Sequence, residues 1–166
     1  MDLSNNNPKR VAVIGASGYG GIQAIRLLKD HPGFELSFLA GNKSVGSNWN
    51  DLCPFLPLKT NPIIEKADPE EIAKRSDFVL LSLPNGLSSQ LMPSLLERNL
   101  RVIDLSADFR YRSLDQWKNI YSDVSNKYLR TDSDLCADAI YGIPELYSDE
   151  ISKSNLVASP GCFPTA

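Results

Sequence analysis

The run Val11-Ala12-Val13-Ile14-Gly15-Ala16-Ser17-Gly18-Tyr19-Gly20-Gly21 decides the fold, because an apolar stretch leads directly into a glycine-rich turn. Residues 11–15 are typical of a buried parallel strand. Between residues 22 and 28 apolar side chains recur at helical spacing, and the His-Pro-Gly at 31–33 predicts the end of that helix. Residues 34–40 alternate apolar with small or polar side chains, as a second strand does. The sequence therefore predicts a strand, turn, helix and strand in that order.

The same alternation continues along the chain. We expect short helices over 69–75 and 114–119, strands over 77–83, 101–105 and 156–158, and a longer helix from residue 87 to about 99. Residues 41–62, rich in Gly, Asn, Ser and Pro and carrying Trp49, are predicted to form a binding loop. Strands that alternate with helices predict an α/β fold with a Rossmann-type, doubly wound and mainly parallel sheet.

Composition excludes several classes of function. The 166 residues carry 17 Lys and Arg against 20 Asp and Glu, for a formal charge of -3, so no basic surplus favours nucleic acid. No apolar run approaches the roughly 20 residues that a membrane span needs. The polar N-terminus lacks a secretory signal, which predicts a cytoplasmic protein. The three cysteines form no paired motif, so neither a disulfide framework nor a metal site is expected.

The glycine-rich turn is the first candidate site. Gly15, Ser17, Gly18, Tyr19, Gly20 and Gly21 follow a strand and open a helix, where backbone N–H groups can receive a pyrophosphate. The alternative is a turn that needs glycine only for helix packing. About 20 residues further on, Asn42, Lys43 and Ser44 stand where enzymes that prefer NAD place a carboxylate. A lysine with polar neighbours suits a 2′-phosphate instead, which favours NADP(H).

Cys162 is the candidate nucleophile. It follows Pro160 and Gly161 at the expected start of a helix, where backbone N–H groups favour the thiolate form. The alternative, a small buried apolar side chain, suits Cys53 and Cys136 better. The single histidine, His31, ends the first helix and is expected on the surface, away from the glycine turn.

Two further segments follow predicted strands at their carboxyl ends, the edge where open α/β sheets bind ligands. Pro84 and Asn85 either contact a cofactor or form a turn that starts a helix. In the segment after residue 105, position alone predicts an internal ion pair between Asp108 and Arg110.

Five segments taken together resemble the N-acetyl-γ-glutamyl-phosphate reductases, NADPH-dependent enzymes of arginine biosynthesis. They are GASGYGG at 15–21, LSLPNG at 81–86, DLSADFR at 104–110, YGIPE at 141–145 and SPGCFPTA at 159–166. The resemblance implies that a Cys162 thiolate attacks an acyl phosphate, expels phosphate and forms a thioester, which NADPH reduces to the semialdehyde. It also implies that the glycine turn, residues 42–44, Pro84 and Asn85 bind the cofactor, and that Ser106 and Arg110 contact substrate.

The chain departs from this family at two positions. Lys43 stands where members commonly have arginine, and it lacks arginine's bidentate geometry. Asn85 stands where many members have histidine.

The resemblance also predicts the domain organisation. Residues 1–10 form a polar segment, 11–159 an NADP-binding domain, and 160–166 the start of a catalytic α+β domain that the chain lacks. We therefore expect these 166 residues alone to be inactive and the full-length protein to be a homo-oligomer. Two alternatives stay open: a stand-alone NADP(H)-binding module, and a reductase like the aspartate-semialdehyde dehydrogenases.

Overall fold

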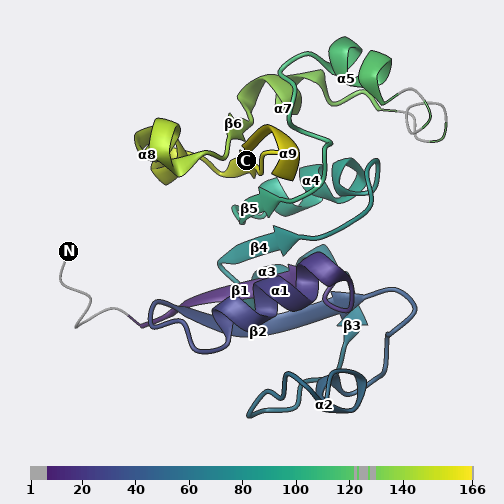
Figure 1. The fold of residues 1–166 in the computed structure, drawn as a ribbon, viewed down its shortest axis with the longest axis vertical. Coiled ribbons are helices and arrows are strands. Elements are labelled where there is room, and N and C mark those ends of the chain that lie inside the picture. Colours follow the sequence, from purple (N-terminus) through teal and green to yellow (C-terminus); the bar gives the residue numbers. More distant parts are fainter. Residues whose placement is uncertain (1–6, 122, 124–126, 128–129, 166) are drawn as a thin grey trace. The chain divides into compact units, whose positions relative to one another are not determined.

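A computed structural model describes residues 7–121, 123, 127 and 130–165 (Figure 1). Most of the predicted polar N-terminal segment, residues 1–6, lies outside the described residues. The chain divides into two compact units, residues 1–82 and 83–166, which are described separately below. No helix within the described ranges is long and apolar enough to cross a membrane.

The first unit is built on four parallel strands. They are β1 (Lys9–Ile14), β2 (Phe34–Gly41), β3 (Glu65–Lys66) and β4 (Phe78–Leu81). Strand β1 pairs with β2 on one side and β4 on the other, and β3 extends the sheet beyond β2. The nearly continuous burial of residues 11–14 follows from this central place, because a middle strand is covered on both faces.

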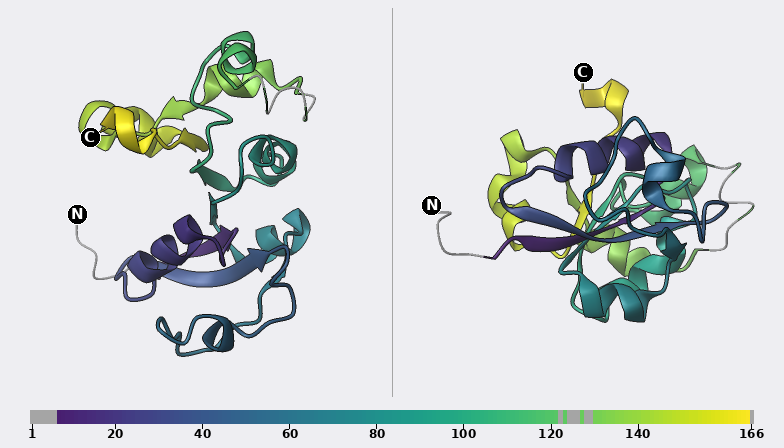
Figure 2. Two further views of the ribbon diagram at one scale, coloured as in Figure 1. Left: turned by 45° about the vertical axis from the view of Figure 1, so that its right-hand side comes forward. Right: turned by 90° about the horizontal axis from the view of Figure 1, so that it is seen from below.

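Two helices cover opposite faces of these strands. Helix α1 (Tyr19–Leu28) buries Ile25 in one cluster with Leu39 of β2. From α3 (Pro69–Arg75), the Arg75 guanidinium lies 4.2 Å from the centre of the Phe38 ring. Neighbouring residues of a strand point to opposite faces, so α1 and α3 lie on different sides of β2. The right-hand view of Figure 2 shows α1 along one side of the strands.

The segment predicted as a binding loop is anchored by Trp49. This side chain opens the short helix α2 (Trp49–Leu52), is fully buried and donates its indole N–H to the Leu56 carbonyl at 2.7 Å. It packs in the core cluster together with Cys53, Leu56 and Ile64. The connection is therefore folded onto the sheet, and Trp49 contributes to the core.

The second unit contains three parallel strands. They are β5 (Arg101–Asp104), β6 (Ile140–Tyr141) and β7 (Leu156–Ala158), with β7 between the other two. The described helices of this unit are α4 (Ser88–Leu96), α5 (Leu114–Ile120), α7 (Ser133–Asp138), α8 (Pro144–Lys153) and α9 (Cys162–Thr165).

The predicted α/β class with parallel strands is confirmed, and the short helix expected over 69–75 matches α3. The sequence reading missed β3, β6, α2, α7 and α8. Strands β3 and β6 have only two residues each, too few to show an alternating pattern. Helix α8 buries none of its residues, so its sequence has no apolar stripe from which a helix could be predicted.

We expect Trp49→Ala to lower the free energy of unfolding by about 3–5 kcal/mol, because it leaves a cavity in the core and removes the indole hydrogen bond. Urea unfolding followed by circular dichroism measures this change. Phe55 of the same connection is 72% exposed, so Phe55→Ala is the matched control, with an expected change of about 0.5 kcal/mol or less. Equal losses in the two variants would contradict the anchoring role of Trp49.

Candidate functional site

Two glycines of the 15–21 turn are required by packing. Gly15 has φ +84°, and a Cβ there would lie 2.1 Å from the Ser82 carbonyl oxygen. A Cβ on Gly21 would lie 2.2 Å from the Gly15 carbonyl oxygen. The packing interpretation thus accounts for these two positions, which bring α1 close to the end of β1.

The N-terminus of α1 carries no protein cap. Its N-cap is Gly18, no side chain hydrogen-bonds to the first turn, and that turn has no acidic residue. By contrast, Asp68 caps α3 and Ser113 caps α5 with their side chains. Gly18 and the adjoining Ser17 and Tyr19 are exposed. The first N–H groups of this ten-residue helix, together with its dipole, are therefore exposed donors that could hold an anion such as a phosphate group.

The segment after β2 divides into an exposed and a buried part. Asn42 and Lys43 are exposed, whereas Ser44 is buried and its Oγ lies 3.0 Å from the Ser17 Oγ. This hydrogen bond joins the segment to the glycine turn. Lys43 therefore supplies an exposed cation next to a turn suited to phosphate, and no described residue from 42 to 44 is a carboxylate.

In the second unit, the end of β5 carries buried polar side chains. Asp104 is fully buried, and its carboxylate accepts hydrogen bonds from the Ser106 N–H at 3.0 Å and the Ser106 hydroxyl at 2.6 Å. Burial raises the pKa of Asp104, and the hydrogen bonds from Ser106 offset part of that rise. Ser106, predicted to contact substrate, is itself only 4% exposed and engaged in this network.

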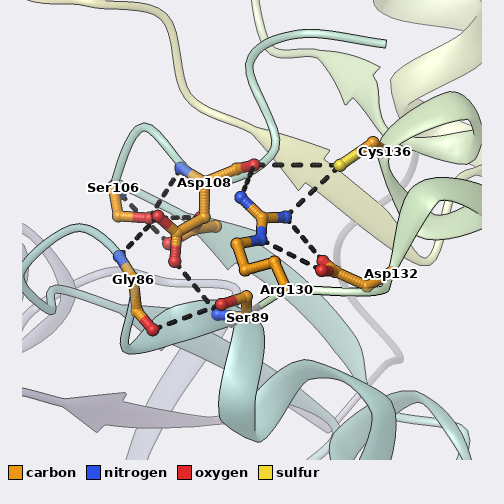
Figure 3. A network of polar contacts seen from close by, with 8 residues as sticks. Gly86, Ser89, Ser106, Asp108, Arg130, Asp132 and Cys136 are labelled. Atoms are coloured by element: carbon orange, nitrogen blue, oxygen red, sulfur yellow. Dashed lines mark hydrogen bonds and ion pairs between the residues drawn. The ribbon is translucent and has the colours of Figure 1, made fainter. Parts of the chain in front are cut away.

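Asp108 is the centre of the network (Figure 3). One carboxylate oxygen accepts the Gly86 N–H at 2.6 Å, and the other accepts the Ser89 N–H at 3.0 Å. Burial raises the pKa of Asp108, while these two backbone N–H groups act in the opposite direction. Helix α4 has no cap from its own N-cap residue, so a carboxylate from another segment takes that role.

Arg130 holds the backbone of Asp108 from the other side. Its Nη1 donates to the Asp108 carbonyl at 2.7 Å, while its other nitrogens bind both Asp132 oxygens at 3.0 and 2.5 Å. The guanidinium also lies over the Trp117 ring at 4.3 Å. The Cys136 thiol completes the group, 3.3 Å from Arg130 Nη2. A buried cation is thereby balanced by one carboxylate and by hydrogen bonds on several sides.

The predicted ion pair between Asp108 and Arg110 is wrong. Arg110 donates from Nε to the Ser159 carbonyl at 2.9 Å and from Nη2 to the Leu105 carbonyl at 3.0 Å. Backbone N–H groups already satisfy the Asp108 carboxylate, which leaves the guanidinium to the two carbonyls. Arg110 thus ties the segment after β5 to the residues that precede Cys162.

The three thiols differ in exposure. Cys162 begins α9 and is exposed, whereas Cys53 and Cys136 are buried, as predicted. Burial raises the pKa of both buried thiols. His31 is exposed and accepts the Gly33 N–H through Nδ1 at 3.0 Å, as expected for a residue beyond the helix end. No three or more His, Cys, Asp or Glu side chains gather into a possible metal site in the described part of the chain.

A cavity of about 820 Å³ lies elsewhere in the first unit, along residues 34–39 of β2 and residues 57–60 of the following connection. It includes none of the glycine-turn residues. The charged side chains Arg10 and Arg75 on its wall are already paired with Asp77 and Glu65. The candidate residues of the first unit are therefore those of the glycine turn and residues 42–44, and those of the second unit, taken by itself, are Asn85 and Cys162.

Sequence reasoning missed the roles of Asp104, Arg130 and Cys136. The sequence does indicate a role for Asp104, because a carboxylate that ends an otherwise apolar strand must find partners on burial. For Arg130 the only local signal is Asp132, two residues further on, since its other partners include Asp108, 22 residues away, and the aromatic rings of Phe109 and Trp117.

Comparisons with known proteins found a family model and named relatives that match this chain. Residues 10–154 match the family model described as semialdehyde dehydrogenase, NAD binding domain. The chain is 64% identical over all of its 166 residues to an N-acetyl-gamma-glutamyl-phosphate reductase of Prochlorococcus marinus strain SARG, covering 46% of that protein. It is 57% identical over 164 residues to one of Parasynechococcus marenigrum, again covering 46%. The chain thus spans about half the length of these relatives.

Solved structures show the same fold. An aspartate semialdehyde dehydrogenase II of Vibrio cholerae, complexed with ASA, matches 95% of this chain and 43% of its own, with a TM-score of 0.63 and 21% identity. The aspartate semialdehyde dehydrogenase of Candida albicans with NADP matches 63% of this chain and 31% of its own, with a TM-score of 0.55 and 25% identity.

We expect iodoacetamide to label one thiol in the native chain and three after denaturation. Cys162 is exposed, whereas Cys53 and Cys136 are shielded and their raised pKa values leave less thiolate at neutral pH. Mass spectrometry counts the labels. The matched variant Cys162→Ser should take up none while native, and native labelling at Cys136 would contradict the buried network.

We expect the free energy of unfolding of Asp104→Asn, compared with that of wild type, to be higher at pH 7 than at pH 4.5. The pKa of Asp104 is higher in the folded protein than in the unfolded chain, so folding favours the protonated carboxyl group. Wild type therefore loses stability as the pH rises above the unfolded-state pKa of about 3.9. The uncharged amide escapes this loss. Urea unfolding at both pH values measures the difference.

Asp77→Asn is the control with the opposite sign. Arg10 lowers the pKa of Asp77, so its carboxylate stabilises the fold at neutral pH and this contribution is lost in acid. The variant should therefore be less stable than wild type at pH 7, by a margin that narrows at low pH. The same sign of change in both variants would refute the assignment of Asp104.

Proposed function

The chain belongs to the family of semialdehyde dehydrogenase NAD-binding domains, and from this premise we propose that it is part of an NADPH-dependent acyl-phosphate reductase. The proposed reaction converts N-acetyl-γ-glutamyl phosphate into N-acetylglutamate semialdehyde. The observation that carries this choice of substrate is the 64% identity, over the whole chain, to a relative named for that substrate.

The first unit is proposed to bind the phosphates of NADP(H). The uncapped N-terminus of α1 receives the pyrophosphate through its N–H groups, next to exposed Ser17 and Tyr19. Asn42 and Lys43 bind the 2′-phosphate, while Ser44 holds their segment to the glycine turn through Ser17. Gly15 and Gly21 shape the turn, and the exposed Gly18 and Gly20 are proposed to contact the ligand. When bound, the cofactor supplies the hydride.

Cys162 is proposed as the nucleophile. Its thiolate attacks the carbonyl carbon of the acyl phosphate, a carbon–sulfur bond forms, and the carbon–oxygen bond to phosphate breaks as phosphate leaves. The product of this step is a thioester, at the oxidation level of the acyl phosphate. Arg110 holds the Ser159 carbonyl three residues earlier and so steadies the segment that carries the thiol.

The resemblance to the reductase family supports Ser106 and Arg110 as substrate contacts. Of the two, Arg110 suits a phosphate group better, since it is half-buried and positively charged, whereas the Ser106 hydroxyl is already bonded to Asp104. Pro84 and Asn85 are proposed to contact the nicotinamide end of the cofactor. We place the nucleotide-binding domain at residues 11–159 and the start of the catalytic domain at 160–166, in a cytoplasmic homo-oligomer.

A second candidate is a reductase of aspartyl phosphate. Its support is the structural likeness to the aspartate semialdehyde dehydrogenase of Vibrio cholerae, at a TM-score of 0.63. Because that likeness rests on 21% identity, it shows the fold alone, and the higher identity to the N-acetyl-gamma-glutamyl-phosphate reductases supports the first candidate. Competition between the two acyl phosphates in the full-length protein distinguishes them.

Lys43→Glu should weaken NADPH binding by about tenfold or more and leave NADH binding within about twofold, because the substitution places a negative charge beside the 2′-phosphate. Titration of reduced-nucleotide fluorescence on this chain measures both affinities. Lys59→Glu makes the same charge change at an exposed lysine outside the proposed site and should alter neither. Equal weakening of NADPH and NADH by Lys43→Glu would contradict the assigned 2′-phosphate contact.

The reaction itself is tested in reverse. N-acetylglutamate semialdehyde, phosphate and NADP⁺ are supplied to the full-length protein and to these 166 residues, and NADPH formation is followed. We expect turnover by the full-length protein, its loss in Cys162→Ser with NADPH affinity retained, and none from the 166 residues alone. Nucleotide binding without turnover in the full-length protein would favour a stand-alone binding module.

A further inference from the structure

The turn at residues 84–86 is held in place by the segment that follows β5. Gly86 and Ser89 donate their N–H groups to the two oxygens of Asp108, at 2.6 and 3.0 Å. The Ala107 N–H donates to the side-chain oxygen of Asn85 at 2.9 Å. Three hydrogen bonds therefore join two segments that lie about 20 residues apart in the sequence, and all three use a backbone N–H group as donor.

These contacts fix the orientation of the Asn85 amide. An N–H group can only donate, so the atom that faces Ala107 must be the carbonyl oxygen of Asn85. Its side-chain NH2 group points the other way and donates to no described residue. The NH2 group thus offers a ligand two hydrogen-bond donors, while the oxygen of the same amide is engaged by Ala107.

Asp108 can hold the turn because each of its own polar groups has a partner. Its N–H donates to the Ser106 Oγ at 3.1 Å, and its carbonyl accepts from Arg130 at 2.7 Å. The side chain is fully buried, so the two backbone N–H groups that it accepts are shielded from water. Rotation of this carboxylate would leave two buried donors and a charge without partners, which makes the arrangement rigid.

We propose that Asp108 is a positioning residue, which fixes the 84–86 turn so that the Asn85 NH2 group donates to the carboxamide oxygen of the nicotinamide. This inference rests on the proposed function, since it takes NADP(H) as the ligand. Asp108 touches no ligand and acts through Asn85.

The test compares two nucleotides on this chain. NADPH carries the nicotinamide, whereas adenosine 2′,5′-bisphosphate has the 2′-phosphate but no nicotinamide. We expect Asn85→Ala and Asn85→Asp each to weaken the binding of NADPH by about tenfold or more and the binding of the bisphosphate by less than about twofold. Asn85→Asp is the sharper variant, because it keeps an oxygen that accepts the Ala107 N–H and replaces the NH2 donor by a negatively charged acceptor oxygen.

Asp108→Asn tests the positioning role. The amide oxygen of the variant can accept one of the N–H groups of Gly86 and Ser89, but its NH2 group opposes the other. The affinity for NADPH should therefore fall about as much as in Asn85→Ala, and the affinity for the bisphosphate should not change. Adding Asp108→Asn to Asn85→Ala should cause no further loss. Asp68→Asn is the matched control, since Asp68 caps α3 in the same way but is exposed.

Amide hydrogen exchange gives a readout that needs no nucleotide. Gly86 and Ser89 should be protected in wild type and in Asp68→Asn, and should exchange at least about tenfold faster in Asp108→Asn. If Asp108→Asn does not fold, Asn85→Asp and the wild-type exchange rates decide. The proposal is overturned by additive losses in the double variant, by equal weakening of both nucleotides, or by unprotected Gly86 and Ser89. If wild type binds neither nucleotide, the proposed function fails, while the exchange rates still report whether Asp108 holds the turn.

Discussion

The first unit depends on the close approach between Gly15 and the carbonyl oxygen of Ser82. A Cβ at residue 15 would lie 2.1 Å from that oxygen, well inside the contact distance of any side chain. Strand β1 runs between β2 and β4, and its end must pass the end of β4 before the chain turns into α1. Only a residue without a side chain passes there at a φ of +84°. The position of α1, and of the anion site at its N-terminus, follows from this constraint.

In the second unit, the structure depends on how buried charged side chains are satisfied. Asp104, Asp108 and Arg130 are all buried, and each would be costly without partners. The partners come from local turns at residues 86–89 and 106–108, from Asp132 and from aromatic rings. Fully satisfied buried networks are rigid, because any movement breaks several bonds together. Loops that connect strands to helices thereby gain a fixed geometry without regular secondary structure.

The two units therefore contribute different chemistry to the proposed reductase. The first offers the backbone N–H groups at the start of α1 and the exposed Lys43, which suit phosphate groups. The second offers side chains: the exposed Cys162 thiol, the Asn85 amide and the Arg110 guanidinium. The Ala107 N–H binds Asn85, and Arg110 binds the Ser159 carbonyl, three residues before Cys162. The acyl-transfer step in particular needs a thiol of fixed position, which a free loop would not provide.

Much of this protein could be predicted from local sequence patterns. The run at residues 11–21, the helix at 69–75 and the glycine-rich turn each have a local physical cause, since apolar periodicity and glycine act within a few residues. Cys162 is a candidate nucleophile on the same grounds, from its place at a predicted turn; the structure shows that it is exposed, and its role stays a prediction. The two-residue strands and helix α8, which buries none of its residues, carry no such pattern and could not be predicted from the sequence.

The sequence by itself determined the fold class, the order of the main elements and the residue types at the candidate site. Only the tertiary structure decided which charges meet. Sequence proximity favoured a pair between Asp108 and Arg110, yet Asp108 accepts N–H groups from residues 86 and 89 and Arg110 binds the Ser159 carbonyl. The physical reason is that buried charges are satisfied by the donors and acceptors that folding brings within about 3 Å, and separation along the chain has no influence on that distance.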